Sequence, residues 1–517
     1  YDVGPQTLRT HGGIPVFGLY AGWRNTVEVT YTRVFQGEEK TVTESYVINT
    51  QPAWLETTGN PAIAQNFMTA KVTTPAPKEF SDRLYFINNL GAADVRASRA
   101  VWNNPVGGAL QWNNPPRNAI LDTKGEIRWY MKADRIYDPE SLYDAGIMMG
   151  FHQNADGALS WGYGQHYAKY DLLGRKVFNR RLPANYADFS HAMMPAENGG
   201  YFLRVASPDL RRADDTRVRT VRDVIIEVDA SGEVVDEWRL FEILDPNRNI
   251  VLKSIDQGAV CLNIDTSQSG KTLSAEQLAK LEAQHAFGDI AGTGAGRNWA
   301  HVNSVDHDPV DDSIILSSRH QSAVVKIGRD KQVKWILAAP NGWRDGLKDK
   351  VLTPVGKDGR PLSCRIGKCE GGFDWTWTQH TAWKIDELSK GDIVYVSVFD
   401  NGDGRAFVQP EDQNEKYSRA VVYKIDQKAM TVEQVWEYGK ERGHELYSPI
   451  TSSVEYQADK NSVVVYWASI GTGSKTGPAP VLTEFRWGET KPAFEMHLKG
   501  GLGYRALPID AQKAFVR

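Results

Sequence analysis

Val325-Lys-Ile-Gly-Arg-Asp-Lys-Gln-Val333, followed by Trp335, decides the fold because its pattern recurs along the chain. An apolar strand runs into a polar turn, and a second strand follows that often ends in tryptophan. Similar hairpins occur at residues 120–129, 170–177, 226–238, 422–436 and 483–488. Six copies of one hairpin indicate a repeat architecture, because a sandwich would not explain the recurrence of a single hairpin.

Residues 299–337 form the best-preserved repeat unit. The unit has the length of one propeller blade, about 40 residues. It contains His301-Val-Asn-Ser-Val305, then Ser313-Ile-Ile-Leu-Ser-Ser-Arg319, and then the hairpin described above. Four strands per unit, repeated radially, predict an all-β fold with a six-bladed β-propeller around a central channel.

The residues before the repeats form an independent β region. Residues 26–34 and 41–47 alternate apolar and polar side chains, and Gln36-Gly-Glu-Glu39 between them supplies a turn. Thr73-Thr-Pro-Ala-Pro77 is interpreted as a linker, so residues 1–74 form an N-terminal domain and residues 75–517 form the propeller. A Ser-x-x-Gln capping box at Ser274 predicts a helix within an insertion near residues 241–298.

Composition excludes several classes of protein. Sixty Lys and Arg residues against 64 Asp and Glu give a net charge of −4, which is too balanced for a general nucleic-acid binder. No apolar run approaches ~18 residues, so no membrane span is expected. An apolar content of 41% is ordinary for a soluble globular protein.

Two of the three cysteines, Cys364 and Cys369, lie five residues apart in a stretch rich in Gly and Lys. Two cysteines are too few for a zinc site, which usually needs four ligands. A disulfide with a short loop is the favoured interpretation, and an unpaired thiol pair is the alternative. A disulfide in turn favours an oxidising compartment such as the periplasm.

Histidines recur at one phase of the repeat. Aligning the first strand of each unit brings the following residues to equivalent positions: Ile147, His191, His301, His380 and Thr451. The closing unit is expected to take its strand from the C-terminal residues 503–507. Because the first strand of each blade lies innermost, these side chains are predicted to converge on the channel axis.

The residues near these histidines indicate which chemistry they support. A metal site would favour carboxylates at neighbouring phases, and none of the in-phase residues is Asp or Glu. Arg319 instead closes the second strand of the unit that contains His301, and Asn303 lies two residues beyond that histidine. A guanidinium repels a cation and suits an oxyanion. The channel is therefore predicted to bind an anion such as sulfate, sulfonate, phosphate or carboxylate.

Two other interpretations of the sequence stay open. One is a metal-dependent propeller hydrolase or lyase that uses His191, His301 and His380 as ligands, and the other is a propeller that serves only as a binding platform. Asp400-Asn-Gly-Asp-Gly404 is similar to the start of a calcium loop, but it lacks the later bidentate Glu. We interpret it as a turn.

Several long motifs resemble the bacterial arylsulfate sulfotransferases. They are Gly294-Ala-Gly-Arg-Asn-Trp-Ala-His-Val-Asn-Ser304, Asp312-Ser-Ile-Ile-Leu-Ser-Ser-Arg-His-Gln321 and Cys369-Glu-Gly-Gly-Phe-Asp-Trp-Thr-Trp-Thr-Gln-His-Thr-Ala-Trp383. The likeness continues through Val435-Trp-Glu-Tyr-Gly-Lys-Glu-Arg-Gly443 and covers nearly the whole chain. Motifs of this length are highly specific.

The resemblance implies a fold and an activity. It implies a small N-terminal β-sandwich-like domain before the six-bladed propeller, assembly as a homodimer, and a periplasmic location, with the signal peptide absent from this chain. The implied reaction moves a sulfuryl group from a phenolic (aryl) sulfate to a phenolic acceptor, without a nucleotide sulfate donor. We accordingly expect these two small-molecule partners and no cofactor, metal or nucleic acid.

The resemblance also implies roles for individual residues. It makes His380 the nucleophile, which becomes a sulfohistidine in a ping-pong reaction. The remaining assignments are His191, His301 and Arg319 as holders of the sulfate oxygens, Asn303, Thr451 and Tyr504 as pocket residues, and Cys364 with Cys369 as a disulfide. Ile147 stands where the family pattern has a tyrosine, so aromatic packing against donor or acceptor is not expected at this position.

Overall fold

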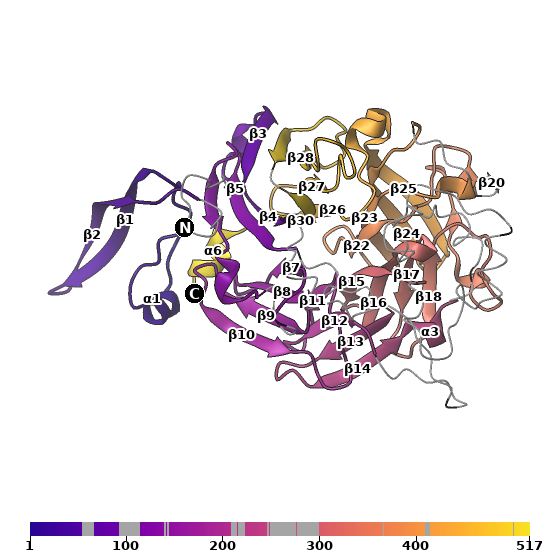
Figure 1. The fold of residues 1–517 in the computed structure, drawn as a ribbon, viewed down its shortest axis with the longest axis horizontal. Coiled ribbons are helices and arrows are strands. Elements are labelled where there is room, and N and C mark those ends of the chain that lie inside the picture. Colours follow the sequence, from indigo (N-terminus) through magenta and orange to yellow (C-terminus); the bar gives the residue numbers. More distant parts are fainter. Residues whose placement is uncertain are drawn as a thin grey trace.

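The structure is a computed structural model, and it shows a ring of β-sheets arranged as blades around a common axis (Figure 1). It describes residues 1–53, 67–91, 114–138, 141, 144–207, 215, 223–245, 248, 276, 299–365, 367–408, 414–499 and 501–517. Six sheets of four or five strands make up the ring, so the predicted six-bladed propeller is confirmed.

From the axis outward, the strands of each blade follow one another in the order given below. The first three blades are β30 (Leu502–Pro508), β4 (Leu84–Leu90), β5 (Pro116–Asp122) and β6 (Ile127–Tyr130); β7 (Met149–Gln153), β8 (Leu159–Tyr163), β9 (His166–Tyr170) and β10 (Lys176–Arg181); and β11 (Met193–Pro195), β12 (Tyr201–Val205), β13 (Val224–Val228) and β14 (Val234–Arg239). The other three are β15 (Val302–Asp308), β16 (Ser313–Ser318), β17 (Ala323–Ile327) and β18 (Val333–Leu337); β22 (His380–Lys384), β23 (Ile393–Asp400), β24 (Arg419–Asp426), β25 (Thr431–Tyr438) and β19 (Thr353–Pro354); and β26 (Ser453–Gln457), β27 (Ser462–Trp467), β28 (Val481–Arg486), β29 (Phe494–Lys499) and β3 (Thr69–Thr74).

Five of the six hairpins found in the sequence are the third and fourth strands of their blades, and residues 483–488 cover the third strand of the last blade, β28, and the turn after it. In two blades a fifth strand, β19 or β3, lies outside these strands. The hairpin that decided the fold, for example, is β17 and β18, whose antiparallel register pairs Val325 with Ile336. The predicted closing strand is also confirmed. β30 comes from the C-terminus and pairs antiparallel with β4, with Ala506 opposite Ile87, so the two ends of the propeller sequence complete one blade.

β3 differs from the interpretation of residues 73–77 as a linker. This strand pairs with the outer edge of the last blade, where His497 lies opposite Lys71. Thr73 and Thr74 therefore belong to a propeller sheet, because their backbone groups complete its open edge. The domain boundary at residue 74 itself stays a prediction.

The N-terminal region projects from the side of the propeller as a hairpin (Figure 1). β1 (Arg24–Phe35) and β2 (Glu38–Asn49) pair antiparallel around the predicted turn. α1 (Pro5–His11) precedes them and packs near the C-terminal α6 (Ala511–Phe515), since the Gly4 N–H donates to the Phe515 carbonyl at 2.8 Å. Both termini consequently lie beside the first blades.

The remaining elements are short. They are α3 (Leu240–Ile243), β20 (Cys364–Arg365), β21 (Lys368–Cys369) and the 3₁₀ turns η2 (Lys78–Phe80), η3 (Ala133–Arg135), η5 (Arg319–Gln321), η6 (Lys348–Lys350), η7 (Arg405–Phe407) and η8 (Lys440–Leu446). α3 lies at the start of the predicted helical insertion. Most of that insertion, including the helix expected from Ser274, lies outside the described residues.

The apolar core lies between the blades. Fully buried tryptophans such as Trp238, Trp335 and Trp467 pack against β-branched residues of the neighbouring sheet. Burial of this kind contributes about 25 cal/mol per Å² of apolar surface, so the interfaces between blades provide much of the folding free energy. They also fix the position of each inner strand relative to the axis.

Candidate active site

The in-phase residues lie where the inner strands begin, at one end of the channel. His380 is the first residue of β22, and His301 directly precedes β15. His191 and Thr451 each lie two residues before an inner strand, β11 and β26 respectively. The predicted convergence is therefore observed for these four residues, but three of them lie ahead of the strands in which the sequence placed them. Ile147, the fifth in-phase residue, likewise lies two residues before its strand, β7.

The backbone explains this shift. φ is 67° at His191, 43° at His301 and 57° at Thr451, which is the left-handed region. A residue in this region cannot continue a strand, and non-glycine residues adopt it at a cost of about 1–3 kcal/mol. Strain of this size at corresponding positions of three blades identifies a functional region.

Bulges accompany the strain. The pairing of β22 with β23 skips Thr381, and the pairing of β30 with β4 skips Tyr504. An extra residue in one strand redirects the side chains on either side of it. At β7 the bulge contains Gly150, whose φ is 70° and where a Cβ would lie 2.6 Å from the Met193 backbone nitrogen, so this position requires glycine.

His191 and His301 contact each other directly. Their Nε2 atoms lie 3.2 Å apart, and their rings are 4.9 Å apart between centroids. One Nε2 must donate and the other accept, so the pair holds one proton between the two atoms. The Nδ1 atom of His191 lies 2.5 Å from the Ser190 hydroxyl.

His380 is held differently, by two amide groups. Its Nδ1 lies 2.8 Å from Asn401 Oδ1, and its Nε2 accepts the Thr451 backbone N–H at 3.2 Å. The Asn401 amide nitrogen donates to the carbonyls of Ser448 and Thr451, so its oxygen must face the imidazole. Nδ1 therefore carries the proton, and the lone pair of His380 is on Nε2.

The surroundings of His380 keep it neutral. Burial lowers its pKa well below the ordinary value of 6.5, and the positive charge of Arg319 lowers it further, against the hydrogen bond to Asn401 that raises it. The imidazole is 4% exposed and its centroid is 6.5 Å from those of both His191 and His301. A neutral imidazole that keeps its lone pair at pH 7 has the properties of a nucleophile.

Arg319 directly follows β16 and is 1% exposed. Its guanidinium donates to the carbonyls of Thr378 and Pro449 and to Asp403, the last at 3.3 Å. Burial raises the pKa of Asp403, but the charges of Lys416 and Arg319 outweigh it and hold the pKa below its usual range. A buried cation fixed in this way is suited to the charge of an oxyanion.

Two further pocket residues from the sequence, Tyr504 and Asn303, also lie in this region, and so does Ile147, which stands where the family pattern has a tyrosine. Tyr504 stacks edge-on against His191, with 6.0 Å between ring centroids. Asn303 donates to the Gln379 carbonyl at 2.7 Å, next to His380, and its Oδ1 is buried without a hydrogen-bond partner within the described ranges. Ile147 is buried in the same apolar cluster as Tyr504.

Sequence reasoning missed Asn401 and Asp403, which lie in the stretch interpreted as a plain turn. The stretch is a turn, but it follows β23 and brings its polar side chains to His380 and Arg319. His320 was also missed, although its ring lies 4.5 Å from that of His301. Their position in the repeat could have revealed these residues, because each of them follows the second strand of a blade and so lies at the same end of the channel as the histidines.

The disulfide between Cys364 and Cys369 is confirmed, and it links β20 to β21. Among the described residues, no group of three or more His, Cys, Asp or Glu side chains is arranged to hold a metal ion. None of the helices in the described ranges has the length and the apolar composition that a membrane crossing requires.

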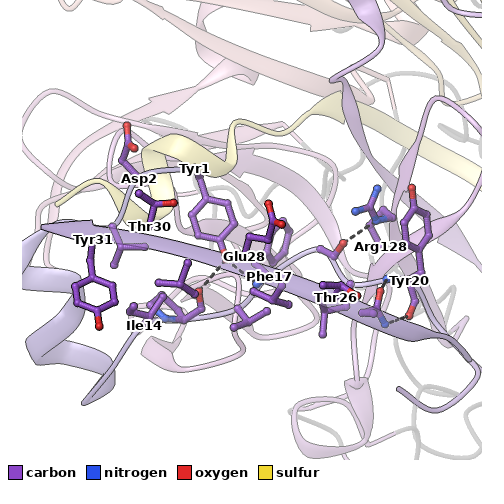
Figure 2. Close-up of a pocket in the computed structure, with 18 of the residues that line it drawn as sticks. Tyr1, Asp2, Ile14, Phe17, Tyr20, Thr26, Glu28, Thr30, Tyr31 and Arg128 are labelled. Atoms are coloured by element: carbon purple, nitrogen blue, oxygen red, sulfur yellow. Dashed lines mark hydrogen bonds between the residues drawn. The ribbon is translucent and has the colours of Figure 1, made fainter. Parts of the chain in front are cut away.

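A separate pocket of about 670 Å³ lies between the N-terminal segment and β1 (Figure 2). Tyr1 points into it, and its hydroxyl donates to the Pro15 carbonyl at 2.8 Å. At the other end Arg128 of β6 donates to the Gly18 carbonyl and stacks over Tyr20. The pocket contains none of the predicted site residues, and its contacts attach the N-terminal segment to the propeller.

Comparison with known proteins agrees with this architecture. The arylsulfotransferase family model matches residues 69–505, and the model for the arylsulfotransferase Ig-like domain matches residues 1–51, in agreement with the predicted β-sandwich-like N-terminal domain. A solved structure of a protein of unknown function from Bacteroides caccae is similar over 83% of this chain and 98% of its own chain. The sequence identity is 11% and the TM-score is 0.41, so this similarity is too weak to support an argument.

Two relatives carry the name arylsulfate sulfotransferase AssT. The protein from Escherichia coli O6:H1 is 44% identical over 486 residues, which cover 91% of this chain and 78% of the relative. The protein from Lelliottia amnigena is 43% identical over 486 residues, with the same coverage of both chains. With a family model that spans most of the sequence, these similarities show that the chain belongs to the arylsulfotransferase family.

Proposed function

We propose that this protein transfers a sulfuryl group from an aryl sulfate to a phenol in two steps, through a sulfohistidine at His380. The observation that carries the proposal is the fixed tautomer of His380. Asn401 holds the proton on Nδ1, and the lone pair on Nε2 is available beside the other two histidines and Arg319. Family membership supports the reaction class.

In the first step, His380 Nε2 attacks the sulfur of the donor and the bond between sulfur and the aryl oxygen breaks. The weak hydrogen bond from Thr451 N–H to Nε2, at 3.2 Å, must open first. Arg319 stabilises the negative charge on the sulfuryl oxygens in the transition state. One well-placed donor of this kind contributes about 3–4 kcal/mol. Asn401 Oδ1 stabilises the positive charge that develops on the imidazole.

The proton shared by His191 and His301 completes this half of the reaction. In the starting state one ring of the pair is an imidazolium, protonated on both nitrogens. The departing phenolate takes the proton between the two Nε2 atoms and leaves as the neutral phenol, and both rings are then neutral, each with its proton on Nδ1. In the second step, the acceptor phenol returns a proton to the pair while its oxygen attacks the sulfur and the bond to His380 breaks. Atoms and protons then balance, and the enzyme returns to its starting state.

The arrangement of the histidines also bears on the metal-dependent alternative. A shared metal would need lone pairs of His191, His301 and His380 directed at one point. Instead, Nε2 of His191 faces Nε2 of His301, so while this contact holds, these two histidines do not direct both lone pairs at a shared ion. The buried Arg319 beside them opposes a cation, so the observations favour an anionic substrate.

We also propose that the protein acts in the periplasm as a homodimer. The disulfide supports an oxidising compartment, because disulfides rarely persist in the cytosol. Sedimentation of the purified protein tests the second part, and a monomer at micromolar concentration would contradict it. Cell fractionation tests the first part.

Mass spectrometry after brief mixing with 4-nitrophenyl sulfate and no acceptor tests the central proposal. We expect a sulfuryl adduct on the peptide that contains His380, observed at alkaline pH because N-sulfoimidazole is labile in acid. Added phenol should discharge the adduct and yield phenyl sulfate. Release of 4-nitrophenol only when phenol is present, with no adduct at any time, would indicate direct transfer between the two substrates.

Controls separate the alternatives. Pre-treatment with a chelator should leave the rate unchanged, and loss of activity that added metal restores would favour the metal-dependent reading. His307, whose Nε2 lies 3.0 Å from Asp312, provides a matched variant outside the channel. His307→Gln should still form the adduct, whereas His380→Gln should not.

A further inference from the structure

A tryptophan lies across the channel next to the histidines. The bulge at Thr381 places His380 and Trp383 on the same face of β22, since they pair with Phe399 and Ser397, which are two residues apart. The Trp383 ring reaches His152 of the second blade, with 6.2 Å between centroids. The indole therefore bridges two blades across the axis and forms a floor below the site.

Arg505 lies against this floor. Its guanidinium stacks over the Trp383 indole at 4.6 Å, and its Nη1 donates to the Phe151 carbonyl at 3.3 Å. The side chain is 3% exposed, and its Nε has no hydrogen-bond partner in the part of the chain that the structure describes. Arg505 directly follows Tyr504, a predicted pocket residue.

The two arginines of the channel differ in their counterions. Arg319 has Asp403 at 3.3 Å, which also pairs with Lys416. Within the described ranges, Arg505 makes no ion pair with a carboxylate. The carboxylate that acts on Arg505, Glu455, is not in ion-pair contact with it, and a buried cation without such a contact is costly. An aromatic face compensates for only part of that cost, so the site is best completed by an anion that enters with the substrate.

We propose that Arg505 is a positioning residue that draws the sulfate group of the donor into the channel, acting from below through the floor formed by Trp383. The inference rests on the proposed function and adds a determinant of donor affinity. An aryl sulfate carries a negative charge and responds to Arg505, whereas a neutral phenol does not. The residue thus distinguishes the donor from the acceptor by charge.

Other charged or titratable groups face Arg505. Glu455 on β26 is the carboxylate whose charge acts on it, and burial raises the pKa of Glu455 to about 7. His152 on β7 is neutral at pH 7, because burial lowers its pKa to about 3. Tyr504 adjoins Arg505 in β30, and His380 lies above it, where the charge of Arg505 contributes to lowering the pKa of the imidazole.

Inhibition by benzenesulfonate tests the proposal, because the compound carries the anionic group but cannot transfer it. We expect Arg505→Gln to raise its inhibition constant by roughly tenfold to hundredfold. Inhibition by neutral phenol should change less than twofold. Arg505→Lys keeps the charge and should restore most of the affinity for the sulfonate.

Glu455→Gln supplies a change in the opposite direction. Above pH 7 Glu455 carries a negative charge that opposes Arg505, so its removal should tighten benzenesulfonate binding a few-fold at pH 8. At pH 6 the carboxyl is mostly protonated and the variant should match the wild type. A purely structural role of Arg505 would produce neither the opposite sign nor the dependence on pH.

The pH profile gives a second readout. Loss of the Arg505 charge should raise the pKa of His380, so the acid limb of kcat/KM should move to higher pH in Arg505→Gln. Arg83, a buried arginine that pairs with Glu484 outside the channel, is the matched control. Arg83→Gln should lower the melting temperature and leave the inhibition constant and the acid limb unchanged.

The outcomes separate this inference from the proposed function. If the wild type forms the His380 adduct but Arg505→Gln binds benzenesulfonate as tightly as the wild type does, the inference about Arg505 is wrong and the function stands. If the wild type forms no adduct and transfers no sulfuryl group, the proposed function fails first. If Arg505→Gln does not fold, Arg505→Lys and Glu455→Gln still decide, and no change in Glu455→Gln at pH 8 would overturn the proposal.

Discussion

His380 and the pair formed by His191 and His301 are the same type of side chain at equivalent places in the propeller, yet they are held in opposite ways. Both nitrogens of His380 meet amide groups that cannot change protonation state. The other two histidines meet each other through Nε2. One ring has a fixed proton, and the other two share a proton that is free to move between them.

This difference indicates a division of labour. A nucleophile needs a lone pair of fixed direction, which an amide partner provides. A general acid and base needs a proton that can leave and return, which a second imidazole provides. The proposed mechanism thus gives one residue type two roles through the choice of hydrogen-bond partner.

The largest expected effect comes from removal of the fixed ring. His380→Ala should lower kcat for transfer from 4-nitrophenyl sulfate to phenol by about 10⁴-fold or more, as expected when a covalent nucleophile is lost. Initial rates of nitrophenol release measure it. If His380→Ala, prepared free of wild-type enzyme, kept more than about 1% of the wild-type rate, His380 would not be the nucleophile. The contrast between His380 and the His191–His301 pair would then no longer hold.

Changes to the proton-sharing pair should have a smaller effect that depends on the donor. His301→Gln should slow transfer by about 10²-fold to 10⁴-fold when the leaving phenol is weakly acidic, because it needs a proton to depart. 4-Nitrophenolate is a better leaving group, so 4-nitrophenyl sulfate should be slowed less than phenyl sulfate. An equal loss for both donors would mean that the pair does not act as the acid.

Asn401 tests whether fixation of the tautomer matters. Asn401→Ala should reduce kcat by about 100-fold, since the imidazole is then free to take the wrong orientation. Asn401→Asp keeps an oxygen in place but adds a negative charge, which raises the pKa of His380 and should shift the acid limb of kcat/KM to higher pH. If both variants behave like the wild type, the amide contact has no role in the reaction.

The smallest expected change is that of the wild type across neutral pH. Burial and Arg319 hold the pKa of His380 well below 6.5, so the ring stays neutral as the pH falls through the ordinary titration range of histidine. On the acid side, kcat/KM for the donor should therefore stay nearly constant down to pH 6.5 and decline only well below it. A midpoint near 6.5 for loss of activity would contradict the assigned environment of His380.

Much of the site was predictable because, in a propeller, equivalent residues of each repeat lie at equivalent places around the central axis. The alignment of six hairpins fixed the innermost strand of each blade, so His191, His301 and His380 were predicted to meet although more than a hundred residues separate the first from the second. The repeat unit that contains His301 also indicated Arg319 and Asn303, and the family resemblance assigned roles to them and to Tyr504. The disulfide was predictable because its cysteines are close in sequence.

Asn401, Trp383 and Arg505 show where such prediction ends. Asn401 lies in a stretch whose composition indicates only a turn. Trp383 and Arg505 reach the axis because single-residue bulges change which face of the strand they occupy, and a bulge has no reliable sequence signature. One inserted residue is enough to reverse the alternation of side chains that a strand pattern assumes.

The sequence by itself determined the all-β class, the six-fold repeat and the histidine constellation, and it predicted an anionic ligand, because each of these inferences depends on residue type and spacing along the chain. The tertiary structure alone decided which nitrogen of His380 bears the proton, which two histidines share one, and which of Arg319 and Arg505 makes no ion-pair contact with a carboxylate among the described residues. Those properties depend on distances of about 3 Å between residues that lie far apart in the sequence, within one blade for His380 and Asn401 and between two blades for His191 and His301. Contacts of that range are set by packing.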